Sequence, residues 1–581
     1  MKRWGFVGAM VLAACAPETS STRGAQNQPC PGVTAGELSE APQALSTPRP
    51  GDADGREAVF IHYRGDGVSA SSLARQLGAE VTATYRSVPA VAARVTPAQK
   101  RALAADPRVE SIEPDAELRA LGPATLPVLG LASQAARGTV SGEYTDGLRK
   151  VQANLVWDRD GDGQPDPRID GDPTLTTGTG ARVCIIDSGL DLDHPELRDA
   201  VVAAHDFLDG DDVPSDKDRT GRWGSGHGTH VAGIIAARAG VGGNNGTHAL
   251  NGGGLMGVAP GAELVIARVL DADGRTQMST VLEALEYCAE QGSRVASLSL
   301  GGGLPTRASL MAFQAAFDKG MLVVAAAGND GTNMVSYPAS DPSVLAVGAL
   351  DGQDRRAEFS SFGDGLALMA PGVDVLSTFP VGQGALSELT VDGTRPLSRP
   401  LLHGPISNTA GKLVDCGSGE TLDSCELSDC SGFVAYVRPG RVPVERAVKN
   451  VMLQGARGVI IGNEVIEGGA EIYALPPGRW VPAVSVNQAG STVLDRTLGY
   501  VVHIQVKSAD YAHMSGTSMA TPYVSGVAAL LFSAYPHATV GQVRKALLSS
   551  ARDLGQAGFD DHYGNGLVQA LEAMRQLDEA L

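Results

Sequence analysis

The stretch from Ser515 to Pro522, Ser-Gly-Thr-Ser-Met-Ala-Thr-Pro, stands directly before an apolar run from Tyr523 to Ala534. Its small residues predict a turn in which the backbone can approach another chain closely. The apolar run predicts a helix, and Pro522 is expected in the first turn, where proline is tolerated. Ser518 then lies where free backbone N–H groups and the helix dipole favour negative charge. Such a serine is a candidate nucleophile that needs a base and a group to orient that base.

Length and composition limit the class of protein. A chain of 581 residues exceeds a single hydrophobic core and predicts several domains. The hydrophobic content of 43% and the charged content of 19% are typical of a globular protein. The formal net charge of −19 argues against a nucleic-acid partner, because binding to phosphates requires a basic surface.

The N-terminus has the pattern of an export signal. Lys2 and Arg3 precede an apolar run from Trp4 to Ala14 that is too short to span a bilayer. The next residue, Cys15, follows Leu-Ala-Ala and resembles the lipidated cysteine of a bacterial lipoprotein; an ordinary secretory signal is the alternative. We predict a signal peptide over residues 1–15 and a lipid anchor at Cys15, which would attach the protein to the outer membrane or cell surface unless it is released.

Composition divides the chain that follows. Residues 16–54 are rich in Pro, Ser, Thr, Ala and Gly and predict a flexible tether. Residues 55–121 alternate strand and helix patterns and predict a small α+β unit, whose final strand is expected at Val109 to Ile112. Residues 122–143 are again rich in Pro, Gly and Ala and predict a linker that is open to cleavage.

Residues 144–383 and 508–581 carry buried-type strands separated by helix patterns. The strands are expected at Arg182 to Asp187, Leu264 to Val269, Val295 to Leu300 and Met321 to Ala327. This alternation predicts an α/β fold with a parallel sheet covered by helices on both faces. Residues 384–507 break the rhythm with several strand-like runs and one helix pattern, and predict a β-rich inserted domain.

Polar side chains stand at the ends of these apolar segments. Asp187 ends a strand, and functional groups gather at the carboxyl ends of strands in open α/β sheets. His227 opens the helix pattern Gly-His-Gly-Thr-His-Val-Ala-Gly and is a candidate general base. Asn329 follows a buried strand, so its amide is a candidate oxyanion donor, with a turn-forming asparagine as the alternative.

Two other interpretations are weaker. Gly178-Thr179-Gly180 precedes the strand at 182–187, whereas the glycines of a dinucleotide-binding fold follow the strand. His230 stands three residues after His227 without the glutamate and the spacing of a zinc-protease helix. We therefore expect His230 to be a packed structural histidine.

The cysteines predict at most a local disulfide. Cys184 lies in an apolar strand and Cys288 in a helix pattern, so both are expected to be small buried hydrophobes. Three others lie in one polar region, where an exported chain can form a disulfide: Cys416, Cys425 and Cys430. Because three is odd, one is free or pairs elsewhere, with Cys30 as a candidate. A zinc site is disfavoured, because no C-x-x-C pair is present there.

One acidic loop is a candidate calcium site. Its carboxylates alternate around a glycine turn: Asp158, Asp160, Asp162 and Asp166. Oxygen ligands in this spacing can surround Ca²⁺, although Ile169 stands where an EF-hand loop has glutamate. A solvated acidic loop is the alternative. We expect no cofactor for catalysis and structural calcium as the metal to test.

Asp187, His227 and Ser518 occur in the chain order of subtilisin. Three segments resemble the signature motifs of the subtilisin-like serine proteases. They are Asp-Ser-Gly from Asp187, His-Gly-Thr-His-Val-Ala-Gly from His227, and Gly-Thr-Ser-Met-Ala-Thr-Pro from Gly516. Ala-Gly-Asn ending at Asn329 stands between the second and third motifs. The resemblance covers most of residues 145–383 and 508–581 and implies a subtilisin-like fold that hydrolyses peptide bonds through an acyl-enzyme.

The resemblance implies a role for each of these residues. Ser518 attacks the scissile carbonyl, His227 takes its proton and returns it to the leaving amine, and Asp187 orients His227. Asn329 and the backbone N–H of Ser518 form the oxyanion hole.

The resemblance also implies where substrate binds. An extended peptide is expected to pair with the edge segment Ser299, Leu300 and Gly301. Ala326 and Gly328 are expected to form a wall of the primary pocket, and an open wall suits large apolar or aromatic side chains. Protein or peptide substrates are therefore expected.

Three further segments resemble parts of the family. Residues 55–121 resemble its inhibitory, I9-like prodomain, notably from Val109 to Asp115, and imply a zymogen that is cut between about 121 and 145. The insert at 384–507 resembles a protease-associated domain, which shapes access to the cleft or substrate choice. The calcium loop of the family is altered here, leaving Glu196 and Asn251 as partial ligands.

The favoured hypothesis is an exported, monomeric serine endopeptidase made as a zymogen, with its own prodomain as inhibitor. A catalytically silent binding lipoprotein is disfavoured, because Asp187, His227, Ser518 and Asn329 are all present. A restricted processing protease or an exopeptidase shares the chemistry and differs only in the cleft.

Overall fold

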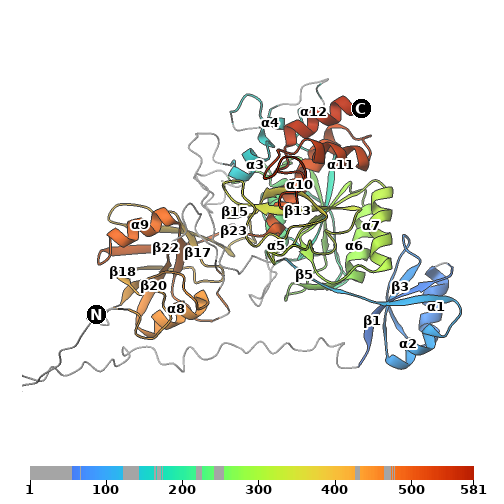
Figure 1. Ribbon diagram of the computed structural model, residues 1–581, viewed down its shortest axis with the longest axis horizontal. Coiled ribbons are helices and arrows are strands. Elements are labelled where there is room, and N and C mark those ends of the chain that lie inside the picture. Colours follow the sequence, from blue (N-terminus) through green and yellow to red (C-terminus); the bar gives the residue numbers. More distant parts are fainter. Residues whose placement is uncertain are drawn as a thin grey trace, which may run out of the picture.

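The computed structural model describes residues 55–65, 67–121, 143–162, 165–166, 172, 174–216, 226–240, 254–425, 432–463, 473, 475–476 and 478–581. The predictions for the export signal, the tether, most of the linker, Cys15, Cys30, Cys430 and Asn251 lie outside these residues. Figure 1 shows an N-terminal unit (residues 55–121) and an insert (residues 384–507) on opposite sides of a central α/β unit. Among the described helices, none combines the length and the hydropathy needed to cross a membrane.

The central unit is built on a seven-stranded sheet in which every neighbouring pair is parallel. Its order is β14 (Leu366–Pro371), β13 (Val344–Leu350), β12 (Leu322–Ala326), β10 (Val295–Leu298), β6 (Arg182–Asp187), β8 (Glu263–Arg268) and β7 (Val201–Asp206). The inner strands are buried almost throughout, because helices cover both faces of the sheet. Their residues therefore do not alternate between apolar and polar along the strand. The edge strand β7 is half exposed, so its apolar pattern is weak and the sequence did not predict it.

Two pairs of helices cover the sheet. α5 (His227–Ala236) packs against α10 (Thr517–Ala534), and α10 lies along β10, β12 and β13. α6 (Met278–Glu290) packs against α7 (Arg307–Asp318), and Figure 1 shows this pair across the sheet from α5 and α10. Both α5 and α10 are buried along almost their entire length, which fits their small and apolar residues.

The expected position of Pro522 is wrong. α10 begins at Thr517, so Pro522 lies inside the helix, more than a turn beyond its start. Proline has no N–H to donate to the carbonyl four residues earlier, which belongs to Ser518. The hydroxyl of Ser299 donates to that carbonyl instead, at 2.8 Å. A side chain from the sheet thus supplies the hydrogen bond that the helix lacks.

The expectation that Cys184 and Cys288 serve as small buried hydrophobes is incomplete. Both residues are fully buried, as expected, but they form a disulfide between β6 and α6. The sequence separation of 104 residues hides this contact, because only the folding of α6 onto the sheet brings the two side chains together. Cys416 and Cys425 form a second disulfide, within the polar region where one was expected.

The N-terminal unit is an antiparallel sheet with two helices. The strand order is β2 (Glu80–Thr84), β3 (Ala90–Val95), β1 (Glu57–Tyr63) and β4 (Val109–Pro114), with α1 (Gly67–Gln76) and α2 (Pro97–Ala104) between them in the chain. The prediction that Val109 to Ile112 is the final strand is wrong. A further strand, β5 (Glu117–Ala120), leaves the unit and lies between β9 (Arg275–Gln277) and β11 (Leu300–Gly301) of the central unit.

The insert is β-rich, as the sequence predicts. Its seven-stranded sheet has the order β16 (Gly384–Val391), β22 (Val501–Ala509), β18 (Asn408–Asp415), β19 (Phe433–Val437), β20 (Ala456–Ile461), β21 (Ala483–Val486) and β17 (Ser398–Pro400). Two helices accompany the sheet, α8 (Val444–Leu453) and α9 (Gln488–Arg496). The buried side chains form clusters of their own, separate from the central core.

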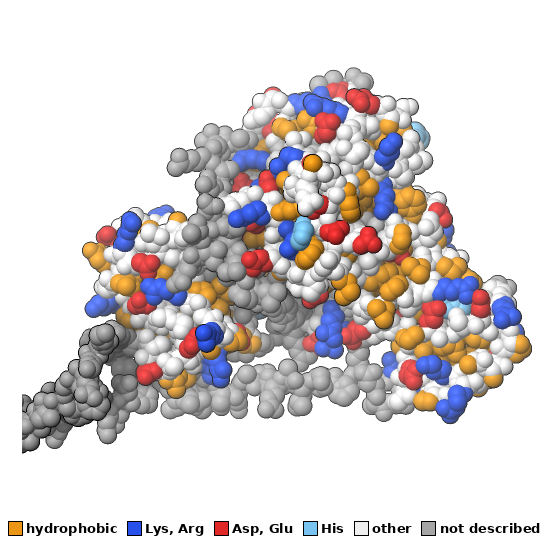
Figure 2. Space-filling model, in the orientation of Figure 1, with side chains coloured by type: hydrophobic (Ala, Val, Ile, Leu, Met, Phe, Trp, Pro, Cys, Tyr) orange, Lys and Arg blue, Asp and Glu red, His pale blue; other side chains and the backbone are white. Residues whose placement is uncertain are grey.

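The insert joins the central unit through an antiparallel ribbon of β15 (Val375–Thr378) and β23 (Tyr511–Met514). β23 runs directly into the turn at Ser515 and Gly516 and then into α10. The insert is therefore attached to the same segment that carries Ser518. On the face seen in Figure 2, acidic and basic side chains are interspersed over all three units.

Candidate active site

Asp187 and His227 lie in contact at the carboxyl end of the central sheet. Asp187 ends β6 and His227 begins α5, and His227 Nδ1 is 2.7 Å from Asp187 Oδ1. Burial alone would lower the pKa of His227, but the charge of Asp187 and its hydrogen bond raise it above the ordinary value. The pair can therefore hold an imidazolium and leave Nε2 available to a reacting group.

A second buried carboxylate, Asp216, lies behind this pair. It accepts hydrogen bonds from Ser188 Oγ at 2.9 Å, Gly226 N at 2.8 Å and Thr229 N at 2.9 Å. These bonds tie the residue after Asp187 to the first turn of the His227 helix. Burial raises the pKa of Asp216 to about 6, against the effect of those hydrogen bonds. The sequence did not single it out, because it stands among several other acids in one loop.

Ser518 lies at the start of α10 and is fully buried. Its Oγ donates to the carbonyl oxygen of Leu121 at 2.6 Å, and the carbonyl oxygen of Ser299 lies at 3.1 Å. His227 Nε2 has no hydrogen-bond partner among the described residues. Among the described residues, Ser518 Oγ thus bonds to Leu121 rather than to His227.

Asn329 also contacts the carbonyl of Leu121. Its Oδ1 accepts hydrogen bonds from both Thr517 N and Thr517 Oγ1, each at 2.9 Å. These two donors fix the orientation of the amide, so Nδ2 faces the site and donates to Leu121 O at 3.0 Å. Two donors thus converge on one peptide carbonyl, and of these the Asn329 amide can stabilise negative charge on its oxygen.

The residues before Leu121 lie as an extended strand in a cleft of the central unit. Ala120 pairs with Leu300 and Arg119 with Gly301 on one side, while Leu118 pairs with Thr276 on the other. Leu118 is fully buried. Leu300 and Gly301, for which the resemblance implies pairing with an extended peptide, thus pair with β5, and β9 lies on its other side.

Two of the residues that the resemblance implies for substrate binding, Ser299 and Gly301, lie next to Leu121. The carbonyl of Ser299 accepts from Leu121 N at 3.4 Å, and a Cβ on Gly301 would come within 3.2 Å of Leu121 Cδ1. Ala326 ends the buried strand β12. Gly328 has a φ of 116°, and a Cβ there would lie 2.4 Å from Ser336 Oγ, so this position favours glycine.

The N-terminal unit docks on the starts of α6 and α7. Asp115 accepts from Ser279 N at 3.0 Å and from Ser279 Oγ at 2.6 Å, and Glu113 accepts from Arg307 N at 2.8 Å. Both carboxylates thus satisfy free N–H groups at helix N-termini, where the dipole favours negative charge. Burial raises the pKa of Asp115 to about 6, although its bonds to Ser279 act in the opposite direction.

The predicted calcium loop brings three of its four carboxylates together. Ligand atoms of Asp158, Asp160 and Asp166 lie within 4.8 Å of one another. Asp162 is exposed, and its N–H donates to Asp160 Oδ1 at 3.0 Å. Three converging carboxylates are a donor set that suits a hard cation such as Ca²⁺.

Glu196 and Glu143 form a second group of acidic side chains. Glu196 is fully buried; Oε1 accepts from Leu255 N and Tyr511 OH, while Oε2 has no hydrogen-bond partner in the described part of the chain. Burial raises its pKa to about 8. Glu143, which the sequence did not single out, is buried nearby and accepts from Gly240 N at 3.0 Å. An unpaired buried carboxylate oxygen fits a cation ligand.

His230 lies away from this chemistry. Its Nε2 is 3.1 Å from the carbonyl oxygens of Val375 and Ala512, and burial lowers its pKa to about 3. A neutral imidazole therefore holds α5 against the ribbon that carries the insert.

The fold and this site define a subtilisin-like serine endopeptidase. The chain belongs to the subtilase family, peptidase S8, which matches residues 178–401 and 483–566. Thermitase from Thermoactinomyces vulgaris is 34% identical over 307 residues, covering 52% of this chain and 95% of thermitase. M-protease from Shouchella clausii is 34% identical over 315 residues, covering 54% of this chain and 68% of that protein.

Solved structures agree with this assignment. A psychrophilic subtilisin-like protease from the Antarctic Pseudoalteromonas sp. AS-11 is 31% identical with a TM-score of 0.55, and the match covers 75% of this chain and 98% of that one. Fervidolysin from Fervidobacterium pennivorans, a keratinolytic enzyme related to subtilisin, has a TM-score of 0.55 at 22% identity, over 90% of this chain and 61% of its own. The second likeness concerns the fold alone.

Proposed function

We propose that this protein is an exported serine endopeptidase, made as a zymogen, that cleaves proteins through Ser518, His227 and Asp187. The observation that carries the proposal is the carbonyl of Leu121, which accepts hydrogen bonds from both Ser518 Oγ and Asn329 Nδ2. A peptide bond held between a nucleophile and an oxyanion donor is in the position of a substrate.

The geometry supports the following chemistry. Ser518 Oγ attacks the carbonyl carbon while His227 Nε2 accepts the hydroxyl proton, and Asp187 stabilises the imidazolium that forms. Asn329 and the N–H of Ser518 stabilise the oxyanion. When the intermediate collapses, the C–N bond breaks, and His227 gives its proton to the leaving amine. Water then attacks the acyl-enzyme with His227 as base, releasing the acid and restoring Ser518.

The N-terminal unit acts as the inhibitory prodomain in this proposal. Its strand β5 occupies the cleft as a substrate does, and Leu121 is the residue whose carbonyl faces Ser518. The maturation bond is therefore Leu121–Gly122, at the start of the region expected from the sequence. Until the cleaved unit leaves, β5 blocks the cleft.

The same strand indicates substrate preference. Leu118 is fully buried and Leu121 packs against Gly301, whereas the side chain of Arg119 is 64% exposed. We infer selection for aliphatic or other large apolar residues at the first and fourth positions before the cut, and little selection at the third. The insert, which resembles a protease-associated domain, is a further candidate source of selectivity.

Structural calcium is also proposed. Asp158, Asp160 and Asp166 would hold one ion, and Glu196 with Glu143 would supply ligands to another, with Asn251 as a candidate from the neighbouring loop. Such ions would neutralise buried carboxylates and stabilise the fold. Export, the lipid anchor at Cys15 and the monomeric state rest on the sequence alone.

Labelling with a fluorophosphonate probe tests the proposal. Wild-type protein should be labelled only after the prodomain is removed, and Ser518→Ala should be neither labelled nor cleaved at Leu121–Gly122. Processed, active Ser518→Ala protein would contradict the assignment. Absence of label on processed wild-type protein would favour the binding-lipoprotein alternative.

A further inference from the structure

We propose that the insert holds the nucleophile turn in its catalytic position, with Arg399 as a positioning residue that acts through Asp374. The inference rests on the proposed role of Ser518. The contact joins the insert to the central unit and includes none of the site residues described above.

Arg399 reaches from β17 of the insert to Asp374 of the central unit. Its Nε donates to Asp374 Oδ1 at 2.7 Å and its Nη2 to Oδ2 at 2.9 Å, so the ion pair is bidentate. The two side chains are only 16% and 4% exposed. A parallel pair of hydrogen bonds fixes direction as well as distance, which lysine cannot do.

Asp374 in turn holds the segment before Ser518. Its backbone N–H donates to Ser515 Oγ at 3.0 Å, and Gly516 N donates to the carbonyl of Gly372 at 2.8 Å. A Cβ on Gly372 would lie 2.8 Å from Gly516 O, so the two segments are packed backbone against backbone. A shift of Asp374 must therefore move Ser515 and Gly516, which lead directly into Ser518.

The ion pair compensates the buried charge of Asp374. The φ of Asp374 is 54°, a left-handed conformation that is unfavourable for a residue with a side chain. The carboxylate is buried, and burial without a cation is costly. Burial would raise the pKa of Asp374, but Arg399 and His513 hold it well below the usual range. Burial and the charge of Arg399 lower the pKa of His513. Of the two residues that contact the Asp374 carboxylate, Arg399 is therefore the one that is positively charged at neutral pH.

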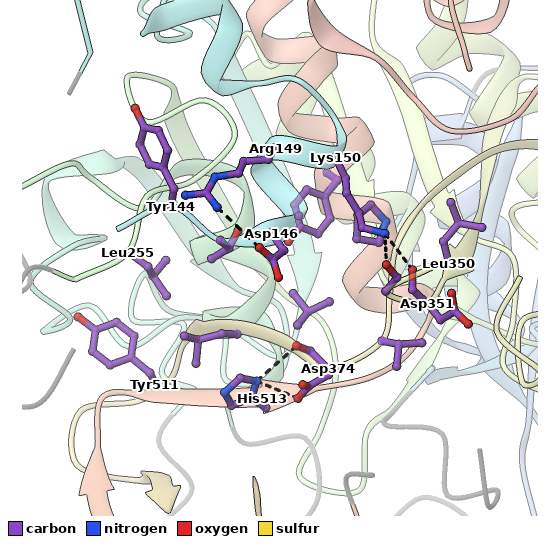
Figure 3. Close-up of a pocket in the computed structure, with 18 of the residues that line it drawn as sticks. Tyr144, Asp146, Arg149, Lys150, Leu255, Leu350, Asp351, Asp374, Tyr511 and His513 are labelled. Atoms are coloured by element: carbon purple, nitrogen blue, oxygen red, sulfur yellow. Dashed lines mark hydrogen bonds and ion pairs between the residues drawn. The ribbon is translucent and has the colours of Figure 1, made fainter. Parts of the chain in front are cut away.

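A cavity of about 430 Å³ lies beside this pair. Figure 3 shows His513 and Asp374 pointing toward each other at its edge, with Asp146 and Lys150 across it. Arg399 also lines the cavity. A small cation in solution therefore has a space from which to replace the guanidinium when the arginine side chain is removed.

The test compares Arg399→Ala with wild type in the full chain. We expect kcat on a peptide substrate to fall by about 30- to 100-fold with KM within about twofold, since small misplacements of a reacting group have effects of this size. Self-cleavage at Leu121–Gly122 should slow by a similar factor, because that bond is already bound. Millimolar guanidinium should restore part of both rates in Arg399→Ala and should not raise those of wild type.

Two further variants separate positioning from general stability. Arg395→Ala removes another arginine of the insert, paired with Glu388 at 3.2 Å and 74% exposed, and should leave kcat unchanged. Asp374→Asn keeps the shape of the side chain and removes its charge; it should lower kcat and gain nothing from guanidinium, because no anion remains.

The outcomes decide between the two proposals. Wild-type kcat in Arg399→Ala or in Asp374→Asn overturns the positioning role, as does a loss that guanidinium does not restore. If Arg399→Ala does not fold, the result for Asp374→Asn decides. Failure of wild-type protein to label or self-cleave would overturn the proposed function instead.

Discussion

The hydroxyl of Ser299 donates to the backbone carbonyl of Ser518 at 2.8 Å. Pro522 cannot make this bond within α10, so Ser299 fixes the first turn of the helix from outside it. Ser299→Ala leaves a buried carbonyl without its partner, and we expect a loss of about 1–3 kcal/mol in unfolding free energy. Urea denaturation measures it. Ser549→Ala, at an exposed site, is the control and should change stability little.

The buried side chains of β5 should control maturation. Leu118→Gln loses the burial of a leucine side chain, worth about 1.5–3 kcal/mol, so self-cleavage should slow by about 10- to 100-fold. Arg119→Gln changes an exposed neighbour and should cleave at the wild-type rate. The rate is followed by electrophoresis, and N-terminal sequencing of the product should begin at Gly122. A product beginning elsewhere would contradict the assigned bond.

Release of the cleaved N-terminal unit should depend on pH. Burial raises the pKa of Asp115 to about 6. Burial also raises the pKa of Glu283, on α6, to about 7. The docked state therefore binds more protons than the separated state, so docking tightens as pH falls from about 7 toward 4 and weakens as pH rises.

Size-exclusion chromatography of the self-cleaved complex at pH 5 and pH 7.5 measures this effect. We expect more dissociation at the higher pH. Asp115→Asn should reduce the difference, because an amide does not titrate and keeps an acceptor for Ser279. Equal dissociation of wild-type complex at the two pH values would refute the linkage.

Removal of calcium should leave the charge of the buried Glu196 side chain without a counter-ion. Burial raises the pKa of this group to about 8, so without a cation the folded state binds more protons than the unfolded state and loses stability as pH rises from about 4.5 to about 8. The drop in Tm caused by EGTA should be larger at pH 8 than at pH 6. Glu196→Gln should remove that pH dependence; the same EGTA effect in the variant would argue against this site.

Four of the seven strands of the central sheet (β6, β8, β10 and β12) and the residues Asp187, His227 and Ser518 were accessible from the sequence because local patterns encode them. Long apolar runs mark these four strands, and Asp187 ends one of them, whereas His227 and Ser518 stand at the start of apolar helix patterns. The structure brings Asp187 and His227 into contact, and it brings Ser518 and Asn329 to one carbonyl.

Other features depend on tertiary contacts that no local pattern carries. Glu-Leu-Arg-Ala of β5 has no strong strand signal, and its conformation comes from the strands on both sides of it. Asp216 is buried whereas Asp209, Asp211 and Asp212 of the same loop are exposed, and no local pattern shows this difference. The Cys184–Cys288 disulfide and the bond from Ser299 to Ser518 join residues that are distant in the chain.

The ribbon of β15 and β23 makes the insert resemble an exchangeable module. Thr378 pairs with Tyr511, so the chain leaves and re-enters the central unit at neighbouring points. A domain whose ends lie side by side can replace a loop with little distortion of its host. Arg399 sets a condition on such exchange, because a grafted domain would also have to present one guanidinium to Asp374. Chimaeras of this protease should therefore be designed around that single side chain rather than around the joints alone.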